Sequence, residues 1–163
     1  MSTNRCNMQP GACGSSVTNP FDNSEICKIR PADDAQVNEA IDAAYAAFHR
    51  PDWRRLTGRE RGKPLYQLAQ LLRRDLESFA ILESIDTGIP IRETRVEVAT
   101  SAVHLEYFAG LTGSIEGSCQ DFGARFNSTR REPFGVVGKI VPWNIPLKLM
   151  ARDLRLLWLA ARR

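Results

Sequence analysis

The chain has 163 residues, of which 43% are hydrophobic and 25% charged, and its formal net charge is +3. This composition is typical of one globular domain and excludes a largely disordered protein. The Lys and Arg residues are dispersed and the net charge is small, which argues against a nucleic-acid-binding protein. No apolar run approaches the roughly 18 residues that a membrane-spanning helix needs.

The first 18 residues are polar and lack the hydrophobic core of a secretion signal, so we expect a mobile tail over 1–18. We therefore favour a cytoplasmic protein. Arg5 and the Ser and Thr content leave a mitochondrial transit peptide as the less favoured alternative. The four cysteines show no metal-ligand spacing, so we predict no metal site and reduced, structural thiols. They are Cys6, Cys13, Cys27 and Cys119.

A turn and a short strand are predicted within "NPFDNSEICKI", residues 19–29. An amphipathic helix follows, because Asp33 or Asp34 can cap its start, apolar residues recur on one face, and Pro51 ends it. The apolar face consists of Val37, Ile41, Ala44, Tyr45 and Phe48.

The next helix is predicted from the capping-box spacing of Thr57 and Glu60, and the helical run stops at Gly88 and Pro90. Its apolar stripe consists of Leu65, Leu68, Leu72, Leu76 and Phe79. Four arginines lie mostly on the opposite side, where a solvated face is the favoured interpretation and an anionic partner the alternative. These are Arg59, Arg61, Arg73 and Arg74.

A further helix is predicted from Arg92 to about Gly110, with a buried side formed by Val96, Ala99, Val103 and Phe108. The stretch "GSCQDFGARFNSTRREP" then alternates and contains turn residues, which predicts a β-hairpin or two short edge strands. The short apolar run "FGVVGKIVP", residues 134–142, predicts a buried strand, and a helical pattern follows from Leu147. This strand-turn-helix order is typical of the opening unit of an α/β domain.

The most chemically specific stretch, Val141 to Asn144, follows the predicted strand. Open α/β sheets bind ligands at the carboxyl ends of their strands. The Asn144 amide could donate a hydrogen bond to an oxyanion there. Asn and Pro after a strand more often form a simple turn, so the residues alone favour that interpretation.

The stretch "REPFGVVGKIVPWNIPL", residues 131–147, resembles the segment of NAD(P)-dependent aldehyde dehydrogenases that leads into the cofactor site. The segments "ESIDTGIP" and "VHLEYFAGLTGSIEG" match the same family in order, and the resemblance extends from about residue 19 to residue 154. It implies an α/β fold that contains an incomplete Rossmann-like cofactor domain. The implied parts are a helical N-terminal part (19–115), an oligomerisation hairpin (116–133), a first strand-turn-helix (134–154) and an aberrant basic tail (155–163).

The resemblance also implies oxidation of an aldehyde to a carboxylic acid with NAD or NADP as cofactor. Val141, Pro142, Trp143 and Asn144 would line the nicotinamide side of the cofactor pocket, and the Asn144 amide would also bind the oxyanion. The hairpin would pair with another subunit, in a homo-oligomer or with a full-length enzyme. The family's catalytic cysteine and glutamate have no match in the sequence, so we expect this chain to be inactive alone. The sequence determines neither the aldehyde nor the choice between NAD and NADP.

The tail after Leu154 departs from the family pattern. Adding one base to its back-translated codons yields Ala-Pro-Ala-Leu-Ala-Gly-Gly-Ala-Thr, which is close to the family's continuation. A one-base deletion or a sequencing error is one explanation, and a natural short form is the other. A non-catalytic fragment that modulates the assembly of full-length subunits is the alternative function. A membrane-surface role is less favoured, and would use the apolar stripe Leu147, Met150, Leu154, Leu157 and Trp158.

Overall fold

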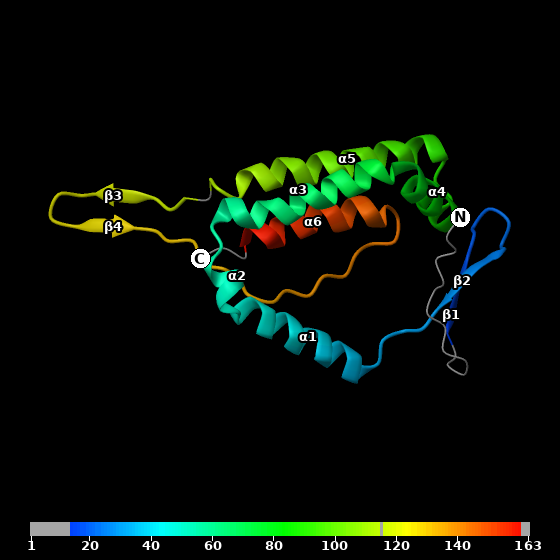
Figure 1. Ribbon diagram of the computed structural model, residues 1–163, viewed down its shortest axis with the longest axis horizontal. Coiled ribbons are helices and arrows are strands. Elements are labelled where there is room, and N and C mark those ends of the chain that lie inside the picture. The colour runs from blue at the N-terminus through cyan, green and yellow to red at the C-terminus, as the bar shows by residue number, and fades with distance from the viewer. Residues whose placement is uncertain (1–13, 115, 161–163) are drawn as a thin grey trace.

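The body of the molecule is a bundle of helices (Figure 1). The computed structural model describes residues 14–114 and 116–154 in full and 155–160 as backbone. Helix α3 (Gly58–Arg74) packs along α5 (Ile91–Leu111), and α5 also packs against α6 (Pro146–Ala160). These three helices lie side by side, so residues far apart in the sequence share one core.

The core lies where α3, α5 and α6 meet. Its buried side chains are small or branched, and are Leu65, Ala69, Leu72, Ala102, Leu105 and Ala151. Leu147 and Leu154 of α6 are partly buried against this cluster, so they are not available to a membrane-surface stripe. No helix in the described part of the chain is long and apolar enough to cross a membrane.

The remaining helices are α1 (Asp34–His49), α2 (Pro51–Arg55) and α4 (Leu76–Thr87). The predicted end of α1 is nearly correct, because α1 stops at His49 and Pro51 starts α2. The apolar face of α1 is largely exposed, and no residue of α1 is buried. The apolar stripe predicted as one helix is divided, because Asp75 separates α3 from α4.

The predicted helix caps are confirmed. The Asp33 side chain accepts a hydrogen bond from the Gln36 amide at 2.8 Å, which fixes the start of α1. Thr57 and Glu60 form the reciprocal capping box of α3, with 2.7 Å between the Thr57 amide and Glu60 Oε2. Gly88 ends α4 with φ at +76°, the left-handed conformation that glycine adopts without strain.

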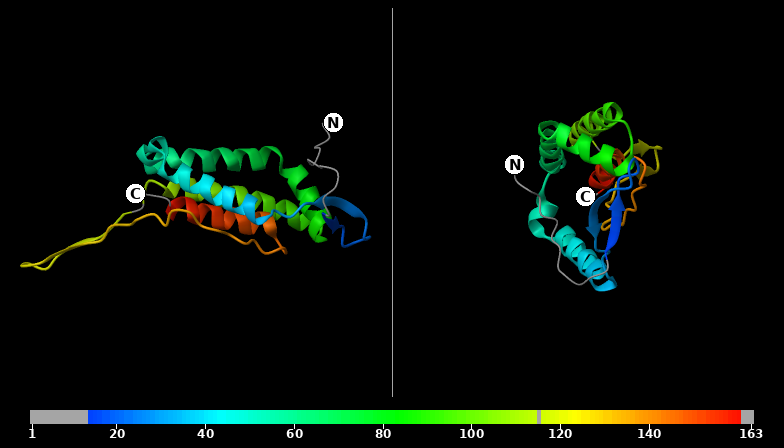
Figure 2. Two further views of the ribbon diagram at one scale, coloured as in Figure 1. Left: turned by 90° about the horizontal axis from the view of Figure 1, so that it is seen from below. Right: turned by 90° about the vertical axis from the view of Figure 1, so that its right-hand side faces the viewer.

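Two antiparallel hairpins lie at opposite ends of the helical body (Figures 1 and 2). Strand β1 (Ser15–Thr18) pairs with β2 (Glu25–Ile29), and β3 (Cys119–Asp121) pairs with β4 (Phe126–Ser128). The expectation of a mobile tail over 1–18 is therefore wrong for residues 15–18, whose backbone is held by the ladder with β2. Residues 1–13 lie outside the described part of the chain.

The buried side predicted for α5 is wrong at two positions. Val96 is 59% exposed and Val103 is 50% exposed, whereas Ala99 and Phe108 are half-buried. The buried residues of α5 are Thr94, Val98, Ser101, Ala102 and Leu105. Apolar side chains occur around most of this helix, so the contacts with α3, α4 and α6 decide which of them face the core.

Arg61 is predicted to lie on a solvated face of α3, and this prediction is wrong. It is only 5% exposed, and its guanidinium carbon lies 6.0 Å from the centre of the Trp53 ring. Trp53 belongs to α2 and Arg61 to α3, so the two helices come within cation–π distance at this point.

The buried strand predicted over 134–142 does not form. This segment is extended but unpaired, and Ile140 is 93% exposed. A parallel strand needs neighbouring strands and covering helices on both faces. Both sheets within the described residues are two-stranded hairpins, and this segment pairs with neither of them. The segment instead runs back along the helical body from the β3–β4 hairpin to the start of α6 (Figure 1).

Candidate functional site

The predicted site residues lie together on one short turn between the extended segment and α6. Val141 is half-buried, whereas Pro142, Trp143 and Asn144 are exposed, Trp143 to 83%. Helix α6 begins directly afterwards at Pro146, whose fixed φ suits the first turn of a helix. The turn therefore presents an indole ring and a side-chain amide to solvent from the start of a helix.

An ion pair ties the chain on the N-terminal side of this turn. Lys139 of the extended segment pairs with Asp153 of α6. Arg152 also contacts Asp153, with 3.1 Å between Arg152 Nε and Asp153 Oδ1. The hydrogen bond from Lys139, followed by that from Arg152, lowers the pKa of the Asp153 carboxyl. The extended segment is thus held against the helix that follows it.

A buried carboxylate holds the other side of the turn. Glu83 of α4 is 6% exposed, and its Oε1 accepts a hydrogen bond from the Leu147 amide at 3.3 Å. This amide is one of the first in α6, where backbone N–H groups lack partners within the helix. Burial raises the pKa of the Glu83 carboxyl, and the hydrogen bond from Leu147 offsets part of this rise.

A second ion pair reinforces the contact between α5 and α6. Lys148 Nζ lies 2.7 Å from Glu97 Oε2, and both side chains are mostly buried. The sequence analysis identified neither Glu83 nor Glu97 as a positioning residue. The helical spacing places Ala80, Glu83 and Thr87 on one face of α4, but only the structure shows that this face is buried at Ala80 and Glu83.

The turn supplies groups that can recognise a ligand, and the two described cysteines lie on other elements. Cys27 lies in β2 and Cys119 in β3, and these hairpins are at opposite ends of the molecule with α6 between them (Figure 1). No group of three or more His, Cys, Asp or Glu residues that could hold a metal ion occurs among the described residues. The turn at Val141–Asn144 can therefore donate one amide hydrogen bond and offer a flat apolar surface.

The chain is similar in sequence to known dehydrogenases. The model of the aldehyde dehydrogenase family matches residues 9–160. The betaine aldehyde dehydrogenase of Bacillus subtilis is 39% identical over 134 residues, which cover 81% of this chain and 27% of that protein. The (Z)-2-((N-methylformamido)methylene)-5-hydroxybutyrolactone dehydrogenase of Acinetobacter baylyi is 42% identical over 148 residues, which cover 88% of this chain and 30% of that protein.

The fold is similar to solved structures as well. The crystal structure of PnpE in complex with nicotinamide adenine dinucleotide matches with a TM-score of 0.84 and 38% identity, over 92% of this chain and 31% of that one. A putative aldehyde dehydrogenase from Burkholderia cenocepacia matches with a TM-score of 0.84 and 39% identity, over the same shares of the two chains. The helices and the two small sheets are thus similar in arrangement to one part of these longer chains. The chain belongs to the aldehyde dehydrogenase family, and it spans less than a third of the length of these relatives.

Proposed function

We propose that the chain provides one wall of the nicotinamide site in an NAD(P)-dependent enzyme that oxidises an aldehyde to a carboxylic acid. The observation that supports this function is the family match, which runs through Val141–Asn144. The residues at this turn fit one side of such a site, because an apolar surface and an exposed amide suit a flat carboxamide-bearing ring.

In the proposed reaction, Asn144 stabilises the oxyanion that develops on the aldehyde oxygen. Its side-chain NH₂ group donates a hydrogen bond, and the ties to α4, α5 and α6 hold the turn in place beforehand. Val141, Pro142 and Trp143 would contact the cofactor and exclude water from it. The cofactor, when bound, supplies the acceptor for the hydride.

The chain alone is not expected to catalyse this reaction. It has one oxyanion donor but no match to the family's nucleophilic cysteine or to the glutamate that activates water. Residues that act as a catalytic unit lose most of their effect together when one is missing. Purified chain mixed with an aldehyde and NAD or NADP should form no reduced cofactor above background. Turnover that survives removal of contaminating dehydrogenases would contradict this expectation.

A chimera tests the role of the turn directly. Residues 19–154 can replace the matching segment of the betaine aldehyde dehydrogenase of Bacillus subtilis, which is 39% identical. The chimera should oxidise betaine aldehyde, followed by absorbance of the reduced cofactor. Asn144→Ala in this chimera should lower kcat by about 10²–10³ and leave cofactor affinity within a few fold, because the lost amide acts mainly on the transition state.

Two further substitutions in the chimera test whether the loss of kcat is specific to Asn144. Trp143→Ala should weaken cofactor binding more than it lowers kcat, since its indole is proposed to contact the cofactor. Asn38→Ala, at an exposed position of α1, is the matched control and should change neither quantity. An active chimera with the same kcat before and after Asn144→Ala would refute the proposed role of Asn144.

A non-catalytic role in assembly is the second candidate, and the β3–β4 hairpin favours it. The hairpin projects from the helical body (Figures 1 and 2), and every residue of both its strands is exposed. An exposed two-stranded hairpin offers edges to which another subunit can add a strand. Co-purification of the chain with a full-length aldehyde dehydrogenase, lost when residues 119–128 are deleted, would support this role. Association that survives the deletion would exclude the hairpin as the contact.

A further inference from the structure

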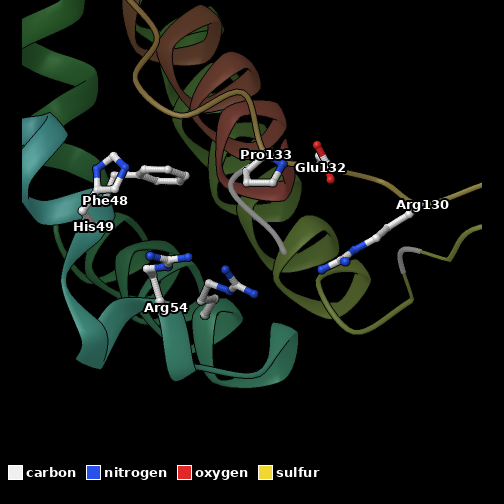
Figure 3. Close-up of a pocket in the computed structure, with 7 residues that line it drawn as sticks. Phe48, His49, Arg54, Arg130, Glu132 and Pro133 are labelled. Carbon is white, nitrogen blue, oxygen red and sulfur yellow. The ribbon is translucent and has the colours of Figure 1, made fainter.

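A basic pocket lies away from Val141–Asn144, between the end of α1 and the chain that follows β4 (Figure 3). Its volume is about 330 Å³, and its walls come from α1, α2, the start of α3 and residues 130–133. The lining residues are Phe48, His49, Arg54, Arg61, Arg130, Glu132 and Pro133. Elements distant in the sequence thus bring three arginines to one cavity.

The three guanidinium groups reach the pocket from different directions. Arg54 comes from α2, and Arg130 comes from the opposite wall with its guanidinium directed toward the pocket (Figure 3). Arg61 is buried at the base of α3, where its contact with the Trp53 ring holds it in position. Such preorganisation reduces the side-chain entropy that is lost when a ligand binds.

The charge and shape of the pocket select among anions. The lining contains three guanidinium groups and one carboxylate, that of Glu132, so the net charge of these side chains is positive. A phosphate monoester is mostly dianionic at neutral pH, because its second pKa is about 6, and it has three acceptor oxygens. Guanidinium groups match such oxygens with paired N–H donors. A carboxylate has one charge and two oxygens, so it leaves part of this donor set unused.

The remaining wall is apolar. Phe48 and Pro133 face the pocket together (Figure 3), and both are half-buried. Pockets for small organic ligands begin at about 300 Å³, and this volume leaves space beyond a phosphate group. We propose that the pocket binds a small phosphomonoester, with its phosphate between Arg54, Arg61 and Arg130 and its organic group against Phe48 and Pro133.

Binding of two probes to the 163-residue chain tests this site. Inorganic phosphate and phenyl phosphate are titrated at constant ionic strength into ¹⁵N-labelled chain, and amide shifts are followed by NMR. Both probes should give saturable shifts at residues 48–54 and 130–132, with tighter binding of phenyl phosphate. Shifts that do not saturate, or that occur elsewhere, refute the site. Equal affinity for the two probes refutes the assignment of a phosphomonoester.

Three variants separate a built site from general attraction of anions to a basic surface. Arg54→Ala and Arg130→Ala each remove one exposed donor from the pocket, so they should weaken phenyl phosphate binding about tenfold or more. Arg55→Ala is the matched control, because Arg55 lies in the same helix, is exposed and does not line the pocket. If Arg55→Ala weakens binding as much as Arg54→Ala, the proposal is wrong.

Discussion

Gly62 lies where α3 and α5 approach closely, and Gly62→Ala should destabilise the protein even though alanine favours helices. A Cβ at this position would lie 2.5 Å from the Ala109 carbonyl oxygen and 2.6 Å from Thr112 Oγ1. Thr112 Oγ1 donates a hydrogen bond to that same carbonyl oxygen at 2.7 Å. The Thr112 side chain therefore cannot rotate away from a Cβ at Gly62 without losing this bond. The helices must therefore shift to admit the methyl group.

The expected magnitude follows from two opposing effects. Overpacking a buried contact typically destabilises by about 1–3 kcal/mol. Replacing glycine by alanine within a helix stabilises by about 0.5–1 kcal/mol. Subtracting the gain from the loss gives a net destabilisation of about 0–2.5 kcal/mol for Gly62→Ala, with a midpoint of about 1 kcal/mol. Gly110→Ala, in α5, is the matched control, because nothing lies within 4 Å of its Cβ position, and it should stabilise by about 0.5–1 kcal/mol.

Urea unfolding measures both changes, and circular dichroism at 222 nm, a wavelength commonly used for helices, follows it. The midpoints can be compared directly when the wild-type and variant chains have equal m-values, which are about 1–3 kcal/mol/M for small proteins. The two substitutions should shift the midpoint in opposite directions. A Gly62→Ala variant stabilised as much as Gly110→Ala would show that α3 and α5 are not in close contact at this point, and the reasoning would fail.

Three other substitutions test particular contacts. Burial raises the pKa of Glu83, so the folded chain binds its proton more tightly than the unfolded chain, and stability from this group falls as pH rises above the ordinary carboxyl pKa. Glu83→Gln should therefore be more stable relative to wild type at neutral pH than at acidic pH; a difference independent of pH would contradict this. Thr94→Val removes the 2.9 Å hydrogen bond to the Ala80 carbonyl and should destabilise the protein by about 1–2 kcal/mol in urea unfolding. An unchanged midpoint would show that this hydrogen bond contributes nothing to stability. Thr57→Ala removes the cap of α3 and should cost about 1 kcal/mol by the same measurement, and an unchanged midpoint would show that the capping box contributes nothing.

Local features of the fold could be predicted from the sequence, whereas features set by distant contacts could not. Asp33, Thr57 and Gly88 were placed correctly because a cap or a helix stop depends on residues within one turn. Val96 and Val103 were wrongly assigned to the core because the apolar pattern of α5 is compatible with more than one buried face. The partner helices select that face, and their positions are not encoded in the periodicity of α5.

In the candidate site, too, the local segment could be found from the sequence, whereas its distant contacts could not. The turn at Val141–Asn144 could be located from its residues and its resemblance to the family, and the family match includes it. Its supports could not be found in this way, because Glu83 is distant from Leu147 in the sequence and meets it only when α4 and α6 pack near each other. The strand expected over 134–142 depends on neighbouring strands, so its local β-branched composition was not sufficient.

The connection between α5 and α6 has a consequence for changes in chain length. Leu111 and Pro146 bound a long excursion that includes the projecting β3–β4 hairpin. The entropy of closing a flexible loop grows only logarithmically, by about 0.6 kcal/mol for each doubling of its length. Because both strands of the hairpin are exposed, insertions at its tip near Gly123 remove no buried contact from the helices. The reach of this projection can therefore change during evolution while the three-helix core keeps its stability.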